Sequence, residues 1–342
     1  MIDAQHLKNL GQEFGIDKIR IATANPLTVA AARIKRQIKD GLYLRSEHWF
    51  RRNIDTFCDV RSVLPGAKSI IAACQCYLTD EETETGPPGR PYGAIARYTW
   101  RNYYSDLRKR LKKIARVLEL ENNARCLVYS NGEIAEKPIA ERCGIGYYGK
   151  NSIIINKDLG SWIVLGEIVT DLELEPDNPV TEDCGTCTKC IEACPTGAII
   201  APYILDRRRC IQALTNWYGV LSDDVANVWG NRLYGCTLCQ EVCPANKNVR
   251  MLPPRASIGL VGSSVSLPDI LEMSEVEYRR KYAHNQMTAT WIDFKAIQRN
   301  AIVALGNIRD RRTLPLLEKM SRNADEVLAR SARWAIANFN RC

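Results

Sequence analysis

The sequence predicts an α+β fold in three parts, and three observations support this interpretation. Helical and strand patterns are mixed over residues 1–175, which is typical of a layered domain. Eight cysteines then gather between residues 184 and 243, and about the last fifty residues carry only helical patterns. With 342 residues, 46% of them hydrophobic, the chain is long enough for two or three domains. We expect these domains at 1–175, 176–250 and 251–342.

The first part is expected to be a layered α/β domain. Its predicted helices cover residues 2–14, 26–40 and 103–120, and its predicted strands cover 69–77, 126–129, 152–156 and 162–169. Residues 80–93 are rich in glutamate, glycine and proline, which favours a solvated loop. Pro176 and Pro179 mark the end of this domain.

The second part carries two cysteine runs. The first has the spacing Cys-x2-Cys-x2-Cys-x3-Cys-Pro of bacterial ferredoxins, in which the fourth cysteine binds a second cluster. The second run, Cys-x2-Cys-x3-Cys-Pro, is one cysteine short because Val242 precedes Cys243, and Cys210 can supply the missing thiolate. Exchanging the two Cys-Pro residues completes two 4Fe-4S sites. These are Cys184, Cys187, Cys190 and Cys243 for one cluster, and Cys194, Cys210, Cys236 and Cys239 for the other.

Two clusters in one small, ferredoxin-like module predict a path for electrons. Zinc is the less favoured alternative. It also takes four thiolates from paired Cys-x2-Cys elements, but it rarely needs a third closely spaced cysteine or a trailing proline.

Six further cysteines lie outside these runs, and we expect them to pack as small hydrophobic residues. They are Cys58, Cys74, Cys76, Cys126, Cys143 and Cys342. The first residues show neither a signal peptide nor a twin-arginine signal, and no apolar run approaches the ~18–20 residues that cross a bilayer. We therefore expect a soluble, cytoplasmic protein without a membrane partner.

The third part is expected to be a connector followed by helices that resemble a HEAT-type repeat, with an ordinary helical cap as the alternative. The chain has a net charge of +8, and basic residues gather in 101–116 and in these last helices. Such runs are usually solvated helix faces, but they are also what neutralises nucleic-acid phosphates. The arginines of the last helices are Arg299, Arg309, Arg311, Arg312, Arg330 and Arg333.

A glycine-rich segment at 140–151 precedes the predicted strand at 152–156. Gly144, Gly146 and Gly149 match Gly-x-Gly-x-x-Gly, but a dinucleotide fingerprint follows a strand instead of preceding one. The glycines permit either close approach of a large flat ligand or tight turns between strands.

At this segment and at all eight cluster cysteines, the chain resembles the epoxyqueuosine reductase family, whose members use cobalamin to remove the epoxide oxygen of epoxyqueuosine in tRNA. The resemblance covers nearly the whole length and is strongest at 140–171, 231–236 and 298–307. It implies that the first domain binds cobalamin without an axial protein ligand. Ile154 and Leu165 match positions that line the corrin in the family.

The resemblance also implies partners and an order of events. The two clusters would reduce the cobalt, fed by an external donor such as a flavodoxin or ferredoxin. The basic helical end would help to dock the tRNA, by its anticodon stem-loop, on a monomeric enzyme.

Two regions depart from the family pattern. Ser130 stands where the family has a proton-donating aspartate, and a serine hydroxyl is too weak an acid to replace it. Glu133 could substitute if this turn starts a helix, although an acid in a first helical turn is also expected for electrostatic reasons alone. Phe57 replaces a usual arginine, and residues 101–105 replace Gly-Lys/Arg-Asp-Tyr-His.

The sequence thus favours a cobalamin-dependent reductase of epoxyqueuosine. One alternative is a related corrinoid and iron-sulfur reductase of another electrophile, as in reductive dehalogenases, against which the basic tail and the missing export signal argue. The other is a ferredoxin-like electron carrier without catalytic activity.

Overall fold

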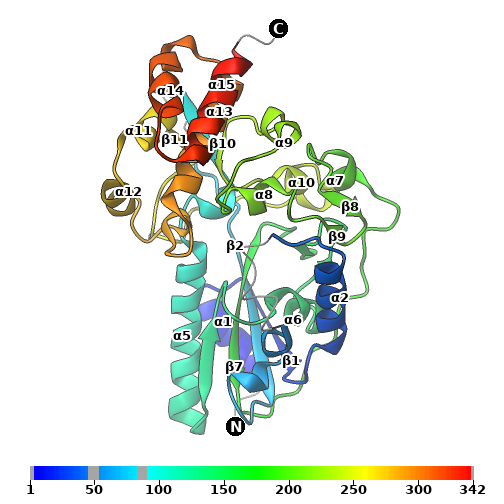
Figure 1. Ribbon diagram of the computed structural model, residues 1–342. Helices are drawn as coiled ribbons and strands as arrows, with labels where there is room; N and C mark the ends of the chain where they lie inside the picture. The colour runs from blue at the N-terminus through cyan, green and yellow to red at the C-terminus, as the bar shows by residue number, and fades with distance from the viewer. Residues whose placement is uncertain (1–3, 45–53, 84–90, 340–342) are drawn as a thin grey trace.

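The structure is a computed structural model that describes residues 4–44, 54–83 and 91–339. Figure 1 shows a sheet flanked by helices in the lower half of the molecule. The cysteine-bearing segment lies above it on one side, and the C-terminal helices lie above it on the other.

The lower half is built on a four-stranded sheet with the strand order β1-β2-β7-β4, in which every neighbouring pair is antiparallel. The strands are β1 (Lys18–Thr23), β2 (Ser69–Cys76), β4 (Cys126–Tyr129) and β7 (Ile163–Thr170). Helices α1 (Ala4–Glu13) and α5 (Tyr103–Asn122) pack on one face. Helices α2 (Thr28–Lys39) and α6 (Glu136–Arg142) pack on the other (Figure 1).

The two central strands are mostly apolar because helices cover both of their faces. All eight residues of β2 are buried. Successive side chains point to opposite faces, so Ile71 enters the core beneath α5, whereas Ala72 and Cys74 enter the core beneath α6. Leu165 of β7 lies on the α6 face as well.

Short elements complete this half. They are α4 (Ile54–Phe57), a 3₁₀ turn η2 (Val60–Ser62), and a hairpin of β5 (Tyr147–Tyr148) and β6 (Ile154–Ile155). The hairpin begins in the glycine-rich segment, which it turns back on itself.

The cysteine-bearing segment is mostly short helices and one hairpin. Its elements are α7 (Lys189–Glu192), β8 (Ile199–Ala201), β9 (Ile204–Leu205), α8 (Ile211–Leu214), α9 (Asp223–Asn227), α10 (Leu238–Glu241) and η4 (Pro244–Asn246). The two cysteine runs fold alike. The Thr188 hydroxyl hydrogen-bonds the Glu192 carboxylate across α7, and the Thr237 hydroxyl donates to Glu241 Oε1 at 2.6 Å across α10.

A second, three-stranded sheet joins distant parts of the chain. Strand β3 (Tyr92–Ile95) lies between β10 (Arg232–Tyr234) and β11 (Ser264–Ser266). It therefore crosses the expected domain division at residue 175. The connector expected after residue 250 is mostly irregular, but it ends in β11, which the sequence did not predict.

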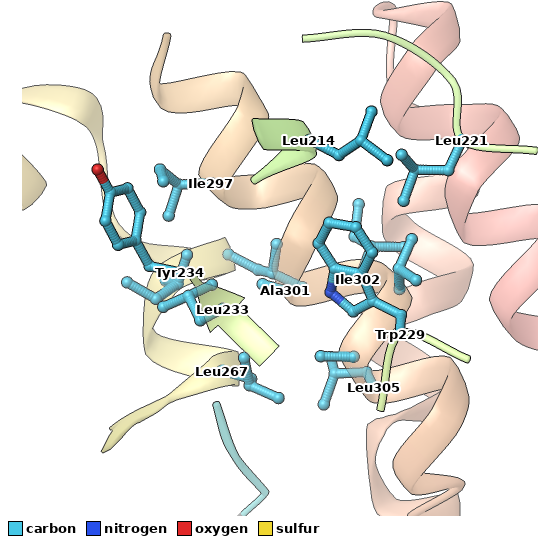
Figure 2. Packing of buried hydrophobic residues seen from close by; sticks show 14 of the residues in the cluster. Leu214, Leu221, Trp229, Leu233, Tyr234, Leu267, Ile297, Ala301, Ile302 and Leu305 are labelled. Atoms are coloured by element: carbon cyan, nitrogen blue, oxygen red, sulfur yellow. The ribbon is translucent and has the colours of Figure 1, made fainter. Parts of the chain in front are cut away.

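The helical end packs against this second sheet. Its elements are α11 (Leu267–Glu272), α12 (Glu275–Lys281), η5 (Gln286–Thr288), α13 (Phe294–Ile308), η6 (Arg311–Thr313), α14 (Leu314–Ser321) and α15 (Glu326–Asn338). Asp293 and Asp325 cap the N-termini of α13 and α15 by accepting backbone N–H groups. Figure 2 shows Trp229 against Ile302 and Leu305 of α13, at the centre of this core.

None of the helices in the described ranges combines the length and the apolar character that crossing a bilayer requires.

Candidate functional site

A cavity of about 1810 Å³ lies between the sheet and the cysteine-bearing segment. Tyr104 of α5, Glu136 of α6 and Leu165 of β7 line it from the sheet side, and Cys210 and Cys239 line it from the other. Its volume exceeds the range of about 300–1,000 Å³ that is usual for small-molecule sites. It could therefore admit a ligand larger than a typical metabolite.

The spacing predicts two groups among the eight cysteines, whose thiols lie near one another in the structure. In the first, burial and the charges of Cys184, Cys243 and Cys187 raise the pKa of the Cys190 thiol. Cys243 itself lies close to Cys184 and Cys187, although it belongs to the other run of the sequence.

The second group gathers around Cys239. Burial and the neighbouring Cys236, Cys210 and Cys194 raise the pKa of its thiol, and Cys190 of the first group contributes as well. The two groups are therefore adjacent. The backbone N–H of Ala198 donates to Cys194 Sγ at 3.3 Å, a contact of the kind that tunes cluster potentials.

The donor set fits iron-sulfur clusters better than zinc. In the described part of the chain, no three His, Cys, Asp or Glu side chains converge as one metal ion requires. Zinc needs all four sulfurs bonded to one ion, whereas a 4Fe-4S cluster takes four thiolates around a larger core of four irons. The four sulfurs around a 4Fe-4S cluster therefore lie farther apart than the four sulfurs around one zinc ion.

Only one cysteine group borders the cavity. Cys194, Cys210, Cys236 and Cys239 all line it. Among the described lining residues, none belongs to the first group. Electrons that enter at the first group would therefore reach the cavity through the second.

The two positions expected to line a corrin lie in different places. Leu165 lines the cavity. Ile154, in contrast, is buried in the core beneath α6 and does not reach the cavity. Side chains alternate along the β5–β6 hairpin, and this alternation gives the cavity position to Ile153 instead. Ile154 is thus not among the described residues that line the cavity, and its contact with a corrin stays a prediction.

The fold itself accounts for two of the three glycines. Gly144 has φ +75°, and a Cβ there would lie 2.3 Å from the Asn178 carbonyl oxygen. A Cβ on Gly146 would lie 2.3 Å from the Ile155 carbonyl oxygen. Both close approaches are to the protein's own backbone, so tight turning explains these glycines without a ligand.

Neither acid candidate from the sequence has the surroundings of a proton donor. Ser130 is buried, its hydroxyl donates to the Leu165 carbonyl oxygen at 2.7 Å, and it is not among the described residues that line the cavity. Glu133 lines the cavity but is exposed. It also precedes α6, which begins at Glu136, so the helical turn expected to place it does not form there.

Two glutamates that the sequence interpretation missed occupy this place. Glu136 is the first residue of α6 and lines the cavity, and the Gly132 N–H donates to its Oε1 at 3.1 Å. Burial raises the pKa of Glu136 to about 7.

Glu167 lies on β7 behind Glu136. It is fully buried, and neither carboxyl oxygen has a hydrogen-bond partner in the described part of the chain. Burial and the charge of Glu136 raise the pKa of Glu167 well above its ordinary value. A lone acid within an otherwise apolar strand was the signal that could have identified it.

The basic residues divide into two kinds. Arg108, Lys109 and Lys112 of α5 are exposed, and so is Arg330 of α15. Arg299, which the sequence interpretation counted with the basic surface, is fully buried. Its guanidinium donates to backbone carbonyls and takes no part in the surface charge.

Two family models match the chain. The model described as "Epoxyqueuosine reductase QueG, DUF1730" matches residues 58–130, and the model described as "4Fe-4S double cluster binding domain" matches residues 183–246. Epoxyqueuosine reductase of Bacillus subtilis (strain 168) is 34% identical, over 98% of this chain and 87% of the relative. That of Escherichia coli (strain K12) is 32% identical, over 98% and 89%.

Solved structures agree. An epoxyqueuosine reductase with an epoxyqueuosine-modified tRNA-Tyr stem loop superposes with a TM-score of 0.89 at 32% identity, covering 98% of this chain and 90% of the other. The Bacillus subtilis enzyme, with an aspartate-bearing catalytic loop swung out of its active site, superposes with a TM-score of 0.88 at 33% identity and the same coverage.

Proposed function

Because the chain belongs to the epoxyqueuosine reductase family, we propose that it reduces epoxyqueuosine to queuosine in tRNA. The observation that carries this proposal is that all four thiols of the second cysteine group line the cavity. Electrons held there would reach a substrate in the cavity without crossing further protein. The reaction takes up two electrons and two protons, removes the epoxide oxygen as water and leaves an alkene.

The proposal assigns the cysteines to two 4Fe-4S clusters. Cys184, Cys187, Cys190 and Cys243 would hold the first, and Cys194, Cys210, Cys236 and Cys239 the second. The proximity of Cys243 to Cys184, Cys187 and Cys190 supports this exchange between the two runs. An external one-electron donor, such as a flavodoxin or ferredoxin, would load the first cluster.

Iron content and electron paramagnetic resonance test this assignment. Cys243→Ser should remove the first cluster, although it lies in the run that supplies most ligands of the second. Cys126→Ser, outside both groups, is the matched control. Loss of the second cluster in Cys243→Ser, with the first retained, would refute the exchange.

The cavity would hold cobalamin, and its residues fit that group. Leu165 and Ile163 of β7 present an apolar wall. When bound, the cobalt supplies the electron transfer to the epoxide, and the chain's own residues orient the substrate and supply protons.

We extend the proposal to the rest of the molecule. The helices α13, α14 and α15 would form a HEAT-like unit whose exposed arginines help to bind the anticodon stem-loop. One copy of the chain would suffice, working in the cytoplasm, where tRNA is available and thiols stay reduced.

Turnover tests the function directly. Anaerobically reconstituted, cobalamin-loaded protein with a chemical reductant and epoxyqueuosine-containing tRNA should form queuosine, measured by mass spectrometry of the nucleosides. Cys239→Ser, which removes a ligand beside the cavity, should abolish the product. Reduced, cobalamin-loaded wild-type protein that forms no queuosine would refute the proposal and leave the reductase of another electrophile as its replacement.

A further inference from the structure

The wall of the cavity beneath α6 holds a pair of carboxyl groups. Glu136 reaches the cavity from the start of α6, and Glu167 lies on the face of β7 that α6 covers. Leu165, two residues before Glu167 on the same face, lines the cavity. The pair therefore runs from the cavity surface inward, with Glu136 in front and Glu167 behind.

The loop before α6 orients the front carboxyl. Asn131 adopts a left-handed conformation, with φ +53°, which asparagine tolerates better than most residues. The following Gly132 N–H points back to Glu136 Oε1 at 3.1 Å. The side chain is thereby fixed at the cavity wall.

The rear carboxyl is the most anomalous group of this sheet. Leu165 and Val169 flank Glu167 on its face of β7, and Ile139 and Ala140 of α6 cover that face. A carboxylate without a single donor is very costly in such surroundings, so the side chain keeps its proton. Glu167 is fully buried and Glu136 is half-buried, and because their negative charges oppose each other, the pair retains at least one proton at neutral pH.

We propose that Glu136 is the catalytic residue that protonates the epoxide oxygen in this chain, and that Glu167 is a positioning residue that keeps a proton on the pair. The inference rests on the proposed function and names an acid for a chain that has Ser130 at the family's aspartate position. The Ser130 hydroxyl donates a hydrogen bond to the Leu165 carbonyl oxygen, and Glu133 is exposed.

The other titratable groups around Glu136 do not replace it. Tyr104 of α5 lines the cavity, but burial raises the pKa of its phenol well above the ordinary value. Lys137 Nζ donates to the Ser152 carbonyl oxygen at 3.0 Å, and its charge only opposes the burial that raises the pKa of Glu136. Glu136 is thus the cavity carboxyl with both a held orientation and a retained proton.

The step balances as follows. One carbon–oxygen bond of the epoxide breaks with the first electron supplied through the clusters, and the oxygen takes the Glu136 proton to become a hydroxyl. The second electron breaks the other carbon–oxygen bond, the carbon–carbon double bond forms, and the oxygen leaves as water with a second proton. Glu136, reprotonated from cavity water between the two steps, supplies that proton too.

Single-turnover kinetics with the cluster- and cobalamin-loaded protein tests the role. Glu136→Gln should slow queuosine formation by about 10²–10⁴-fold, the usual contribution of a general acid, and leave the Kd for the epoxyqueuosine stem-loop unchanged. Glu136→Asp should retain part of the rate. The wild-type rate should fall as pH rises through the pKa of the pair, and this limb should vanish in Glu136→Gln.

A second readout does not depend on turnover. Infrared titration of the cluster-loaded protein without substrate should show protonated-carboxyl absorption that persists to neutral pH and weakens in both Glu136→Gln and Glu167→Gln. If the absorption is present but the wild-type protein makes no queuosine, the proposed function fails and the proton-holding pair stands. The inference is overturned if Glu136→Gln keeps the wild-type rate and pH profile, if Glu133→Gln causes the loss instead, or if the absorption is absent.

Discussion

Single side chains near the cavity decide how this enzyme handles protons, and Ser130 is the one whose substitution is most informative. Its hydroxyl donates to the Leu165 carbonyl oxygen, an arrangement that an ionised aspartate cannot reproduce because it only accepts. The Bacillus subtilis enzyme, in contrast, has an aspartate-bearing catalytic loop that is swung out of its active site in one structure. Here the loop carries serine, and a carboxyl pair lies beside it.

Restoring the family's aspartate should therefore not restore its chemistry. Ser130→Asp would place a carboxyl in a buried position against a carbonyl oxygen, and we expect a loss of roughly 1–3 kcal/mol of stability. We expect no gain in turnover, with both clusters retained by electron paramagnetic resonance. The double variant Ser130→Asp/Glu136→Gln should stay slow. Recovery of the rate in that double variant would show that the family's geometry survives and that Glu136 is dispensable.

Glu167 should lower the free energy of unfolding, and this effect should grow as the pH rises. Its pKa is raised in the folded state, so the folded protein binds a proton that the unfolded chain has lost. Stability is then fully present below the pKa of an unfolded glutamate and falls as pH rises toward the folded-state pKa. Glu167→Leu should make this fall smaller, leaving the part that the raised pKa of Glu136 contributes, raise the thermal midpoint at pH 7 by the equivalent of about 1–3 kcal/mol, and reduce turnover.

Anaerobic thermal unfolding between acid and neutral pH checks the slope. Glu173→Gln, which removes an exposed carboxylate paired with Lys68, is the matched control and should leave the slope as it is. An unchanged slope in Glu167→Leu would mean that the carboxyl is already ionised in the folded protein.

At the scale of elements, the sequence predicted the helices and strands whose residue patterns are clear and missed those whose patterns are weak. Strands β2 and β7 were predicted to within one residue at each end, and β4 was predicted with its full bounds, since each carries a run of apolar or β-branched residues. Strand β1 was missed because its charged residues alternate with apolar ones on a short edge strand. Helix α6 was missed because Pro138 lies in its first turn, where proline is in fact tolerated.

Because α6 was not predicted, Glu136 at its first position was not recognised as a candidate acid. The sequence interpretation made a role for Glu133 conditional on a helix starting at this turn, whereas the structure starts α6 at Glu136. The pairing of Glu136 with Glu167 joins residues 31 positions apart in the sequence, and no local pattern reports such proximity. The grouping of the cluster cysteines, in contrast, was predicted from spacing, because each run repeats a short ferredoxin-like pattern, and it stays a prediction.

Helix α13 holds the second cysteine group in place from a distance. Arg299 donates to the carbonyl oxygens of Leu214 and Trp217 at 2.7 Å and of Gly219 at 2.8 Å, and these residues follow the helix that begins after Cys210. Arg299→Leu would leave the three carbonyls without these donors, which should cost at least about 3 kcal/mol.

Thermal unfolding and cluster spectroscopy separate this effect from a general loss of fold. The signal of the second cluster should disappear at a lower temperature than that of the first in Arg299→Leu. Arg333→Leu is the control, because its ion pair with Glu326 is exposed and worth little. Simultaneous loss of both signals would show that α13 stabilises the molecule as a whole instead of this one group.

At the scale of the whole molecule, strand β3 ties the parts together. It leaves the sheet half, pairs with β10 and β11 beside the helical end, and returns through α5. The cysteine-bearing segment is thereby enclosed between the sheet and the helices, with its second group at the cavity. A linear division of the sequence could not show this, because the pairing joins residues 92–95 to strands more than 130 residues away.

This architecture leaves two basic surfaces that could hold the tRNA, one on α15 and one on α5. A protein that neutralises n phosphates has a binding constant K whose logarithm falls with the logarithm of the salt concentration, with a slope of about −0.9n on duplex and about −0.7n on single strands.

If α15 docks the stem-loop, Arg330→Gln should reduce the magnitude of that slope by about 1 and weaken binding equally for modified and unmodified stem-loops. Arg312→Gln should change the slope less than Arg330→Gln does, because the Asp310 carboxylate already pairs with the Arg312 guanidinium at 2.6 Å. Fluorescence anisotropy over a salt series measures both, and a reduced slope in Arg108→Gln but not in Arg330→Gln would assign the tRNA to α5 instead.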